Sequence, residues 1–281
     1  MSRFSVTTMG QPELDTAVGW AQAEGWNPGT DDAPAFLAAD EGGFLMGHLD
    51  DEPVSSISVV RYGETYGFLG FYICRPEYRG QGFGLKTWDA GMARLEGRTV
   101  GLDGVVEQQD NYRKSGFVLA HNNIRHGGCV DVDQGSDRSV RTVSLEDVAA
   151  ILRYDGVFFP ADRSRFVSAW LSGAGTRRAR VCIEDGEVRG YGVVRQCDRG
   201  SKIGPLFADT EAIAERLFLQ LAAAAPDMPV YLDTPETNPA AVALARRNGL
   251  EPVFETARMY RGEAPQLPAD RTFGITTFEL G

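Results

Sequence analysis

Three glycines alternate within the first half of the chain, at Gly80, Gly82 and Gly84, directly after Arg79. Glycine tolerates backbone conformations that turn several N–H groups toward one point, so the run can form a concave set of donors. A helix is expected to begin here, and its N-terminus adds free N–H groups and a favourable dipole. With the charge of Arg79, the segment is typical of a pyrophosphate-binding loop. The alternative is a tight strand–helix connection that needs glycine only for packing.

Two other phosphate-binding patterns fit this segment poorly. A dinucleotide fingerprint requires G-x-G-x-x-G, whereas the third glycine here comes one residue early. A nucleotide-hydrolase loop requires G-x-x-x-x-G-K-[ST], and Leu85 stands where its second glycine should be, before Lys86. The hairpins expected upstream also conflict with the parallel sheet of such hydrolases. ATP or GTP hydrolysis is therefore disfavoured.

The element before the loop is expected to be a central strand. Residues 66–74 are apolar without alternation, which is typical of a strand covered on both faces. Strand-like runs at 44–49 and 54–62 precede it, and the turn residues between the runs predict an antiparallel meander. Further along the chain, the polar residues 131–138 predict a linker.

The second half repeats the order of elements in the first half. The tripeptide ending at Asp103 corresponds to the one ending at Asp233, and the Gly116-Phe117 pair corresponds to Gly249-Leu250. The length also exceeds that of one typical domain, so two domains are predicted, at residues 1–132 and 139–281. In place of the glycine loop, the second half has residues 201–209, with one glycine and no arginine.

The composition restricts the partners. The 281 residues include 28 Lys and Arg against 39 Asp and Glu, a net charge of −11. This charge repels nucleic acids and anionic membranes and attracts cationic small molecules, although it also simply favours solubility. No apolar run approaches the ~20 residues of a membrane span, and no secretory signal is evident at the start, which predicts a cytoplasmic protein. The four cysteines and three histidines show no zinc-binding spacing, so no metal site is expected.

The run from Arg79 to Gly84 resembles the [Q/R]-x-x-G-x-[G/A] loop of the GNAT acyltransferase superfamily, and the preceding strand, the following helix and the closing Gly116-Phe117 pair extend the resemblance. It implies an α/β fold of the α+β type, with two tandem GNAT-like domains, each a mixed, mostly antiparallel, splayed sheet flanked by helices. It also implies acetyl-CoA as cosubstrate and an amine acceptor. The residues that it implies for the cofactor are Tyr72, Ile73 and Cys74 along the pantetheine arm, and Arg79, Gly80, Gln81, Gly82, Phe83 and Gly84 around the pyrophosphate.

The resemblance further implies a general acid. In this superfamily a tyrosine five residues before the phenylalanine of the Gly-Phe pair often protonates the leaving thiolate, and Tyr112 stands there. The usual asparagine seven residues earlier is replaced by Val105, which makes Asn111 the candidate for its pantetheine contact. The second half keeps Asn238 but has Ala245 instead of the tyrosine. We therefore expect the second domain to lack a cofactor site and to complete the acceptor pocket or act as a packing partner.

The acceptor side is less well defined by the sequence. Trp26 lies between the first two expected helices and is the candidate acceptor-binding residue, by cation–π contact, unless it is a core residue. The candidate bases are Glu64, Asp103 and Glu107. The expected activity is acetyl-CoA-dependent N-acetylation of a primary amine on a small cationic metabolite, by direct attack in a ternary complex. The alternative is a non-catalytic acyl-CoA-binding sensor or interaction protein.

Overall fold

The computed structural model describes residues 3–131, 139–173, 175–225 and 227–281. Of the expected linker at 131–138, all but the first residue lies outside the described residues. In the first half the elements are β1 (Phe4–Thr8), α1 (Gln11–Ala23), α2 (Ala33–Ala39), β2 (Phe44–Leu49), β3 (Glu52–Tyr62), β4 (Tyr66–Cys74), α3 (Phe83–Arg94), β5 (Thr99–Val105), α4 (Gln109–Lys114) and β6 (Val118–Gly128).

The second half follows the same order of elements up to its last long strand. These elements are β7 (Val140–Thr142), α5 (Val148–Asp155), α6 (Ser164–Leu171), β8 (Arg178–Glu184), β9 (Glu187–Gln196), β10 (Ser201–Ala208), α7 (Glu211–Ala223), β11 (Val230–Pro235), α8 (Pro239–Arg247), β12 (Glu251–Arg261) and β13 (Thr272–Gly274). Within the described ranges, no helix is long and apolar enough to span a membrane.

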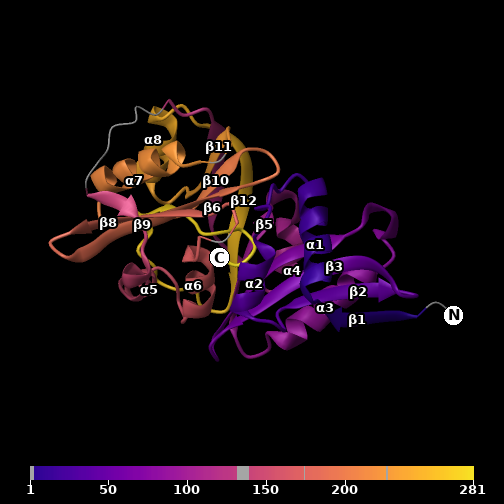
Figure 1. Ribbon diagram of the computed structural model, residues 1–281. Helices are drawn as coiled ribbons and strands as arrows, with labels where there is room; N and C mark the ends of the chain where they lie inside the picture. Colours follow the sequence, from indigo (N-terminus) through magenta and orange to yellow (C-terminus); the bar gives the residue numbers. More distant parts are fainter. Residues whose placement is uncertain (1–2, 132–138, 174, 226) are drawn as a thin grey trace.

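The predicted meander is confirmed, because β2, β3 and β4 are consecutive antiparallel neighbours. The predicted mixed sheet is also confirmed. The strand order is β1-β2-β3-β4-β5-β12-β6-β11-β10-β9-β8-β7, with β4–β5 and β10–β11 parallel, the other neighbours antiparallel, and β13 paired to β10. The helices lie on the faces of this sheet, and the two halves form adjacent lobes (Figure 1).

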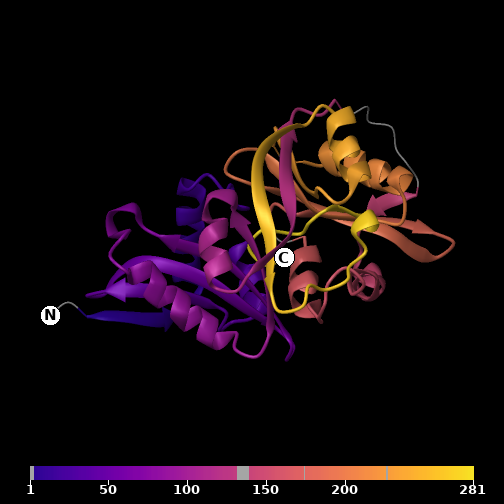
Figure 2. The ribbon, with the colours of Figure 1, turned by 180° about the vertical axis from the view of Figure 1, so that it is seen from behind.

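The two halves exchange their last long strands. β12, from the end of the chain, lies between β5 and β6, and β6 pairs on its other side with β11 (Figure 2). One sheet therefore runs through both halves. The sequence repeat predicts two similar units, but it does not indicate this exchange, since β6 and β12 would have the same local pattern in either arrangement.

Two buried ion pairs fasten the exchanged strands. Arg258 of β12 binds Asp103 of β5 through two hydrogen bonds of 2.7 and 2.6 Å. Arg125 of β6 binds Asp233 of β11 in the same way, at 2.7 and 2.9 Å. Because the two aspartates are the residues that correspond in the sequence repeat, the pairs are related by the internal symmetry of the chain. Bidentate Arg–carboxylate pairs are the geometrically most specific ion pairs in proteins.

The halves also share an apolar core. Phe36 of α2 stacks on Trp170 of α6, with ring centroids 6.0 Å apart and an interplanar angle of 7°. Phe166 of α6 and Phe71 of β4 belong to the same cluster. Such continuous burial makes the two halves one packed body rather than two loosely linked domains.

Candidate active site

The sheet opens between β4 and β5, as the splayed-sheet prediction requires. The two strands pair in parallel only as far as Leu69 and Leu102. Beyond that point β4 is irregular against β3, with a register shift between Ser56 and Ser58, and Phe71 has a φ of 44°. Such a backbone costs a non-glycine residue about 1–2 kcal/mol. The Ser56 hydroxyl, which donates to the Phe71 carbonyl oxygen at 2.8 Å, offsets part of that cost.

The loop predicted to bind pyrophosphate connects β4 to α3. After a 3₁₀ turn at Pro76–Tyr78, Gly80 and Gly82 adopt φ values of 75° and 82°, and Gly82 is the N-cap of α3. A Cβ at either position would meet no atom of the described residues within 4 Å, so glycine is required for its conformation and not for space. The N–H groups of residues 80–83 donate to no acceptor in the described part of the chain. The loop thus presents free donors at a helix start, which suits an anion.

Arg79 braces this loop. Its Nε donates to the carbonyl oxygen of Cys74 at 2.8 Å, and its Nη2 pairs with Glu24 at the end of α1. Half of the arginine side chain remains exposed. Arg79 therefore lines the same cleft as Gly80 and Gly82, and its guanidinium there is paired with Glu24.

The loop, β4 and the start of α4 enclose an open cleft of about 1080 Å³. Most of the residues predicted from the sequence line this cleft. They are Trp26, Tyr72, Ile73, Cys74, Arg79, Gly80, Gly82, Gly84 and Tyr112. The structure thus brings the loop, the strand and the tyrosine to one place.

Three predicted residues do not line the cleft. The Gln81 amide donates to the Glu77 carbonyl oxygen at 2.9 Å, which fixes the preceding turn. Phe83 stacks its ring on β1, at a centroid distance of 5.4 Å. Asn111 donates to the side chain of Gln108 at 2.7 Å and lines a neighbouring groove between α3 and α4. Their predicted cofactor contacts therefore remain predictions.

Tyr112 is fixed at the inner wall of the cleft. Its ring stacks on Trp88, with centroids 5.9 Å apart, and it occupies space that Gly104 leaves free. Burial, and to a smaller extent the nearby Tyr72, raises the pKa of Tyr112 well above its ordinary value. The hydroxyl forms no hydrogen bond with any described residue, and it keeps its proton at neutral pH. It can therefore donate that proton to a bound ligand.

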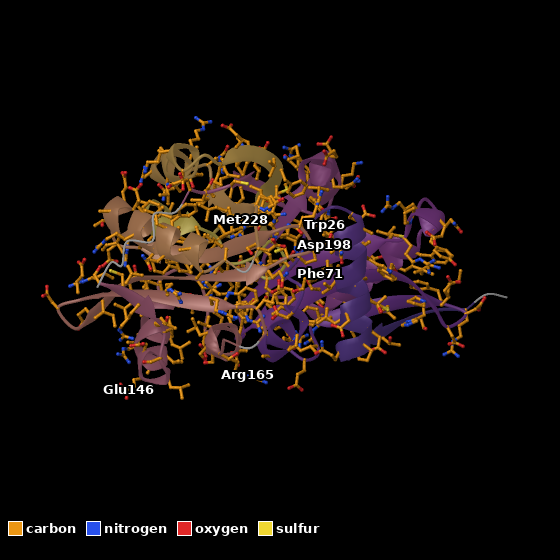
Figure 3. The ribbon with its side chains drawn as sticks, turned by 45° about the horizontal axis from the view of Figure 1, so that its top comes forward. Trp26, Phe71, Glu146, Arg165, Asp198 and Met228 are labelled. Atoms are coloured by element: carbon orange, nitrogen blue, oxygen red, sulfur yellow. The ribbon has the colours of Figure 1, made fainter. Side chains whose placement is uncertain are left out.

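A second, more enclosed cavity of about 480 Å³ lies in the gap between β4 and β5 and shares Trp26, Tyr72, Val105 and Tyr112 with the cleft. Figure 3 shows Trp26 and Phe71 close together where the two halves meet. One wall of this cavity comes from distant parts of the chain. These residues are Phe254 and Thr256 of β12, and Phe278 and Glu279 of the final segment. No local pattern in the sequence marks these four residues.

The turn that carries Trp26 is held by hydrogen bonds from residues of the second lobe, which includes the exchanged strand β6. Arg125 Nη1 donates to the Trp26 carbonyl oxygen at 2.7 Å, and Lys202 Nζ donates to the Asn27 carbonyl oxygen at 2.8 Å. The Asn27 side chain also accepts the N–H of Arg199 at 3.0 Å. Each contact reaches the turn from β6, β10 or the residues between β9 and β10, so the second lobe positions Trp26.

Of the three candidate bases, Asp103 alone lines the inner cavity, and Glu64 and Glu107 are exposed. Asp103 is fully occupied: besides the two bonds from Arg258, it accepts one from Asn123 at 2.8 Å. Burial raises the pKa of Asp103 above its ordinary value although Arg258 and Asn123 favour its charged form. Since these two partners already occupy the carboxylate, it is less available to a bound ligand. Among the described residues, no three or more His, Cys, Asp or Glu side chains form a group suited to a metal ion.

The corresponding gap in the second half is filled by the chain itself. β10 and β11 pair in parallel as far as Ile203 and Leu232, and β13 then pairs with β10 at Leu206 and Phe207. On the opposite side, the N–H of Ile275 donates to β11 at 2.9 Å. A strand of the protein thus lies where the first half leaves an opening.

The structure corrects one expectation about this region. Residues 201–209, expected to replace the glycine loop, form the fully buried strand β10 up to Ala208. Asp209 and Thr210 alone connect it to α7. The glycine and proline at 204 and 205 suggest a loop, but burial of the apolar residues around them favours a strand.

Comparison with known proteins gives a consistent result for both halves. Residues 13–117 match the family described as "Acetyltransferase (GNAT) family", and residues 151–274 match that described as "Acetyltransferase (GNAT) domain". The chain is 33% identical to the holothin acyltransferase of Pseudoalteromonas sp. (strain SANK 73390) over 263 residues. This similarity covers 93% of the chain and 89% of the relative.

Solved structures share the whole fold. A Pyrococcus horikoshii protein assigned provisionally as an acetyltransferase superposes with a TM-score of 0.83 at 22% identity, over 99% of this chain and 96% of that one. A tandem GNAT protein from the clavulanic acid biosynthesis pathway gives a TM-score of 0.63 at 13% identity, over 94% and 100%. Both likenesses concern the tandem architecture.

Proposed function

Since the chain belongs to the GNAT acetyltransferase family, and is an acyltransferase with two such domains in tandem, we propose that its first half binds acetyl-CoA and acetylates the primary amine of a small cationic metabolite. One observation carries the proposal. Gly80 and Gly82 with their free N–H groups, the open part of β4 and the protonated hydroxyl of Tyr112 belong to a single cleft. No metal is part of the proposed reaction.

Each part of the cleft has a proposed role. The loop N–H groups and Arg79 bind the diphosphate. The main chain at Tyr72, Ile73 and Cys74, which has no partner strand on the side of β5, binds the pantetheine arm as an added strand. Acetyl-CoA supplies a thioester whose carbonyl an amine can attack. The main-chain N–H groups near Ile73 and Cys74 stabilise negative charge on the carbonyl oxygen, and Tyr112 donates its proton to the departing sulfur.

We assign a different role to the second domain, whose proposed boundaries are 139–281 against 1–132 for the first. Because β13 fills the gap between β10 and β11, we propose that this domain binds no acetyl-CoA. It completes the acceptor pocket instead, through Phe254, Phe278 and the contacts that hold the turn at Trp26. The Trp26 ring and the net charge of −11 favour a cationic acceptor, whereas the rings of Phe254 and Phe278 already have the Arg125 guanidinium over them.

The test compares Tyr112→Phe with the wild-type protein on a pooled library of amines and labelled acetyl-CoA. We expect the substitution to lower kcat by about 10²- to 10⁴-fold, the usual contribution of a positioned acid. The dissociation constant for CoA should stay within about twofold, since the ring is retained. Tyr231→Phe, on β11 and outside the cleft, is the matched control.

Two results would contradict the proposal. Acetyl-CoA binding without turnover of any amine by the wild-type protein would favour a non-catalytic acyl-CoA sensor. Full activity of Tyr112→Phe would remove the tyrosine from the mechanism while leaving the acyltransferase assignment intact.

A further inference from the structure

The final segment, residues 275–281, is buried between the two lobes. Gly70 of β4 allows its close approach, since a Cβ there would lie 2.4 Å from the Glu279 carbonyl oxygen. The Ser58 hydroxyl donates to that same oxygen at 3.4 Å, and the Tyr62 hydroxyl donates to the Leu280 carbonyl oxygen at 3.1 Å. From the second lobe, Arg163 donates to the Gly281 main-chain oxygen at 3.1 Å. The segment is therefore held rigidly from both sides.

Glu279 is an unusual member of this segment. It lines the inner cavity beside Trp26 and Tyr112, yet only 3% of its surface is exposed. Its carboxyl group forms no hydrogen bond or ion pair with any residue of the described ranges, although its main-chain oxygen does. Burying an unpaired carboxylate is costly, so groups of this kind normally have a partner.

The charges around Glu279 come from four different elements. Lys202 of β10, Arg195 of β9 and Arg125 of β6 attract its negative form, and Asp32 at the start of α2 opposes it. Lys202 bonds Asn27 and Arg125 bonds Asp233. Arg195 bonds Asp32 through Nε, and its two terminal nitrogens have no hydrogen-bond partner among the described residues. Burial outweighs these charges and raises the pKa of Glu279 above its ordinary value. The carboxyl is therefore poised to gain a proton more readily than an exposed glutamate.

The inner cavity holds a second carboxyl, that of Asp103, which is already bound by Arg258 and Asn123. Glu279 is thus the cavity carboxyl, within the described residues, that lacks a donor. An ammonium group is the donor that would satisfy it, because it supplies both N–H bonds and the opposite charge.

We infer that Glu279 binds the protonated amine of the acceptor and removes the proton that blocks its attack. This inference rests on the proposed acetyltransferase function. One N–H bond of the ammonium breaks and a carboxyl O–H bond forms, which leaves the nitrogen lone pair free. The nitrogen then forms the amide bond as the carbon–sulfur bond breaks, the sulfur takes the Tyr112 proton, and a second nitrogen proton restores the phenol. Glu279 returns its proton to water when the product leaves.

The test uses Glu279→Gln, with Glu255→Gln on an exposed site of β12 as the control. Two acceptors are compared: the amine that the library screen identifies, and an analogue fluorinated beside the nitrogen, which is neutral at the assay pH. We expect Glu279→Gln to lower kcat/KM by about 100-fold for the basic amine, and by less than about threefold for the analogue. In wild type, kcat/KM should rise at low pH as the Glu279 carboxyl loses its proton, and this rise is the acidic limb of the profile. In Glu279→Gln the acidic limb should disappear, and kcat/KM should instead follow the fraction of free amine, rising steadily toward the pKa of the amine. Glu255→Gln should match wild type in all respects.

Equal losses for both acceptors, with the acidic limb retained, would overturn the inference and leave Glu279 a structural residue. Because the test starts from an amine that wild-type protein acetylates, this outcome leaves the proposed function standing. Glu279→Asp covers the case in which the glutamine variant does not fold. The shorter carboxylate should retain the acidic limb at reduced kcat, and loss of that limb in Glu279→Asp would also refute the inference.

Discussion

The substitution Gly104→Ala adds one methyl group next to the ring of Tyr112, the proposed acid. It should displace the ring while leaving the hydroxyl group itself unchanged. A Cβ at Gly104 would lie 2.1 Å from Cε2 of Tyr112 and 2.9 Å from two further ring atoms. Ordinary contact begins near 3.4 Å, so the ring must move by roughly 1.3 Å. Trp88, stacked at 5.9 Å, restricts where it can go. Gly104 itself has no positive φ, so alanine fits its backbone.

This displacement sets the size of the effect. A misplacement of about 1 Å in a catalytic group can cost on the order of 10²-fold in rate. We therefore expect kcat for Gly104→Ala to fall by about 100-fold, while overpacking lowers stability by about 1–3 kcal/mol. The measurements are steady-state kinetics with the identified amine and urea unfolding. Gly19→Ala, on an exposed site of α1 with no atom within 4 Å of its Cβ, is the control and should keep full activity.

A double variant tests whether the loss passes through the hydroxyl. If Gly104→Ala acts by moving Tyr112, then adding it to Tyr112→Phe should cost little more, since the acid is already absent. Losses that multiply would refute this reasoning. So would a Gly104→Ala variant with wild-type kcat and lowered stability, because the ring would then have moved without consequence.

Two further predictions concern the loop and the exchanged strands. Gly82→Ala places a side chain at a φ of 82°, which costs about 1–2 kcal/mol. If the loop loses this amount of binding free energy, KM for acetyl-CoA should rise by about 5- to 30-fold, with kcat nearly unchanged in steady-state kinetics. Asp233→Asn leaves the charge of Arg125 buried without its partner and should lower the free energy of unfolding by about 3–5 kcal/mol in urea. Burial alone would raise the pKa of Asp233, but Arg125 holds it below its ordinary value. The ionised carboxylate therefore stabilises the fold above about pH 4. This stabilisation is lost as the pH falls through the pKa of Asp233 in the folded protein. The stability difference between wild type and Asp233→Asn should therefore shrink on acidification.

The cleft was largely predictable because its parts are local in sequence. Gly80 and Gly82 adopt positive φ values that favour glycine, so their residue types reveal the turn. Arg79 precedes them directly, so a few consecutive residues are enough to recognise the loop. Tyr112 was found through its distance from Phe117, which reflects a short helix packed on the sheet. Strands, loop and helix then meet because consecutive elements of this fold are neighbours in space.

The inner cavity could not be predicted in the same way. Phe254 and Glu279 reach it through the strand exchange and the final segment, and each is more than 140 positions from Tyr112 in the chain. β13 is three residues long, too short for a periodic signal. The repeat did mark Asp103 and Asp233 as equivalent, but it gave no sign that each binds an arginine from the other lobe's strand.

Under the proposed function the two halves have different roles although they share a fold, and the chain after β12 accounts for the difference. Residues 272–274 fill the gap between β10 and β11, and residues 278–279 continue into the cavity between β4 and β5. One segment therefore closes the second opening and builds the wall of the first. Under the proposed function, the loop at 79–84 that binds the diphosphate lies in the first half alone, whereas Phe278 and Glu279 of the inner cavity lie in the final segment. Substitutions in the final segment should then change the choice of amine without weakening acetyl-CoA binding.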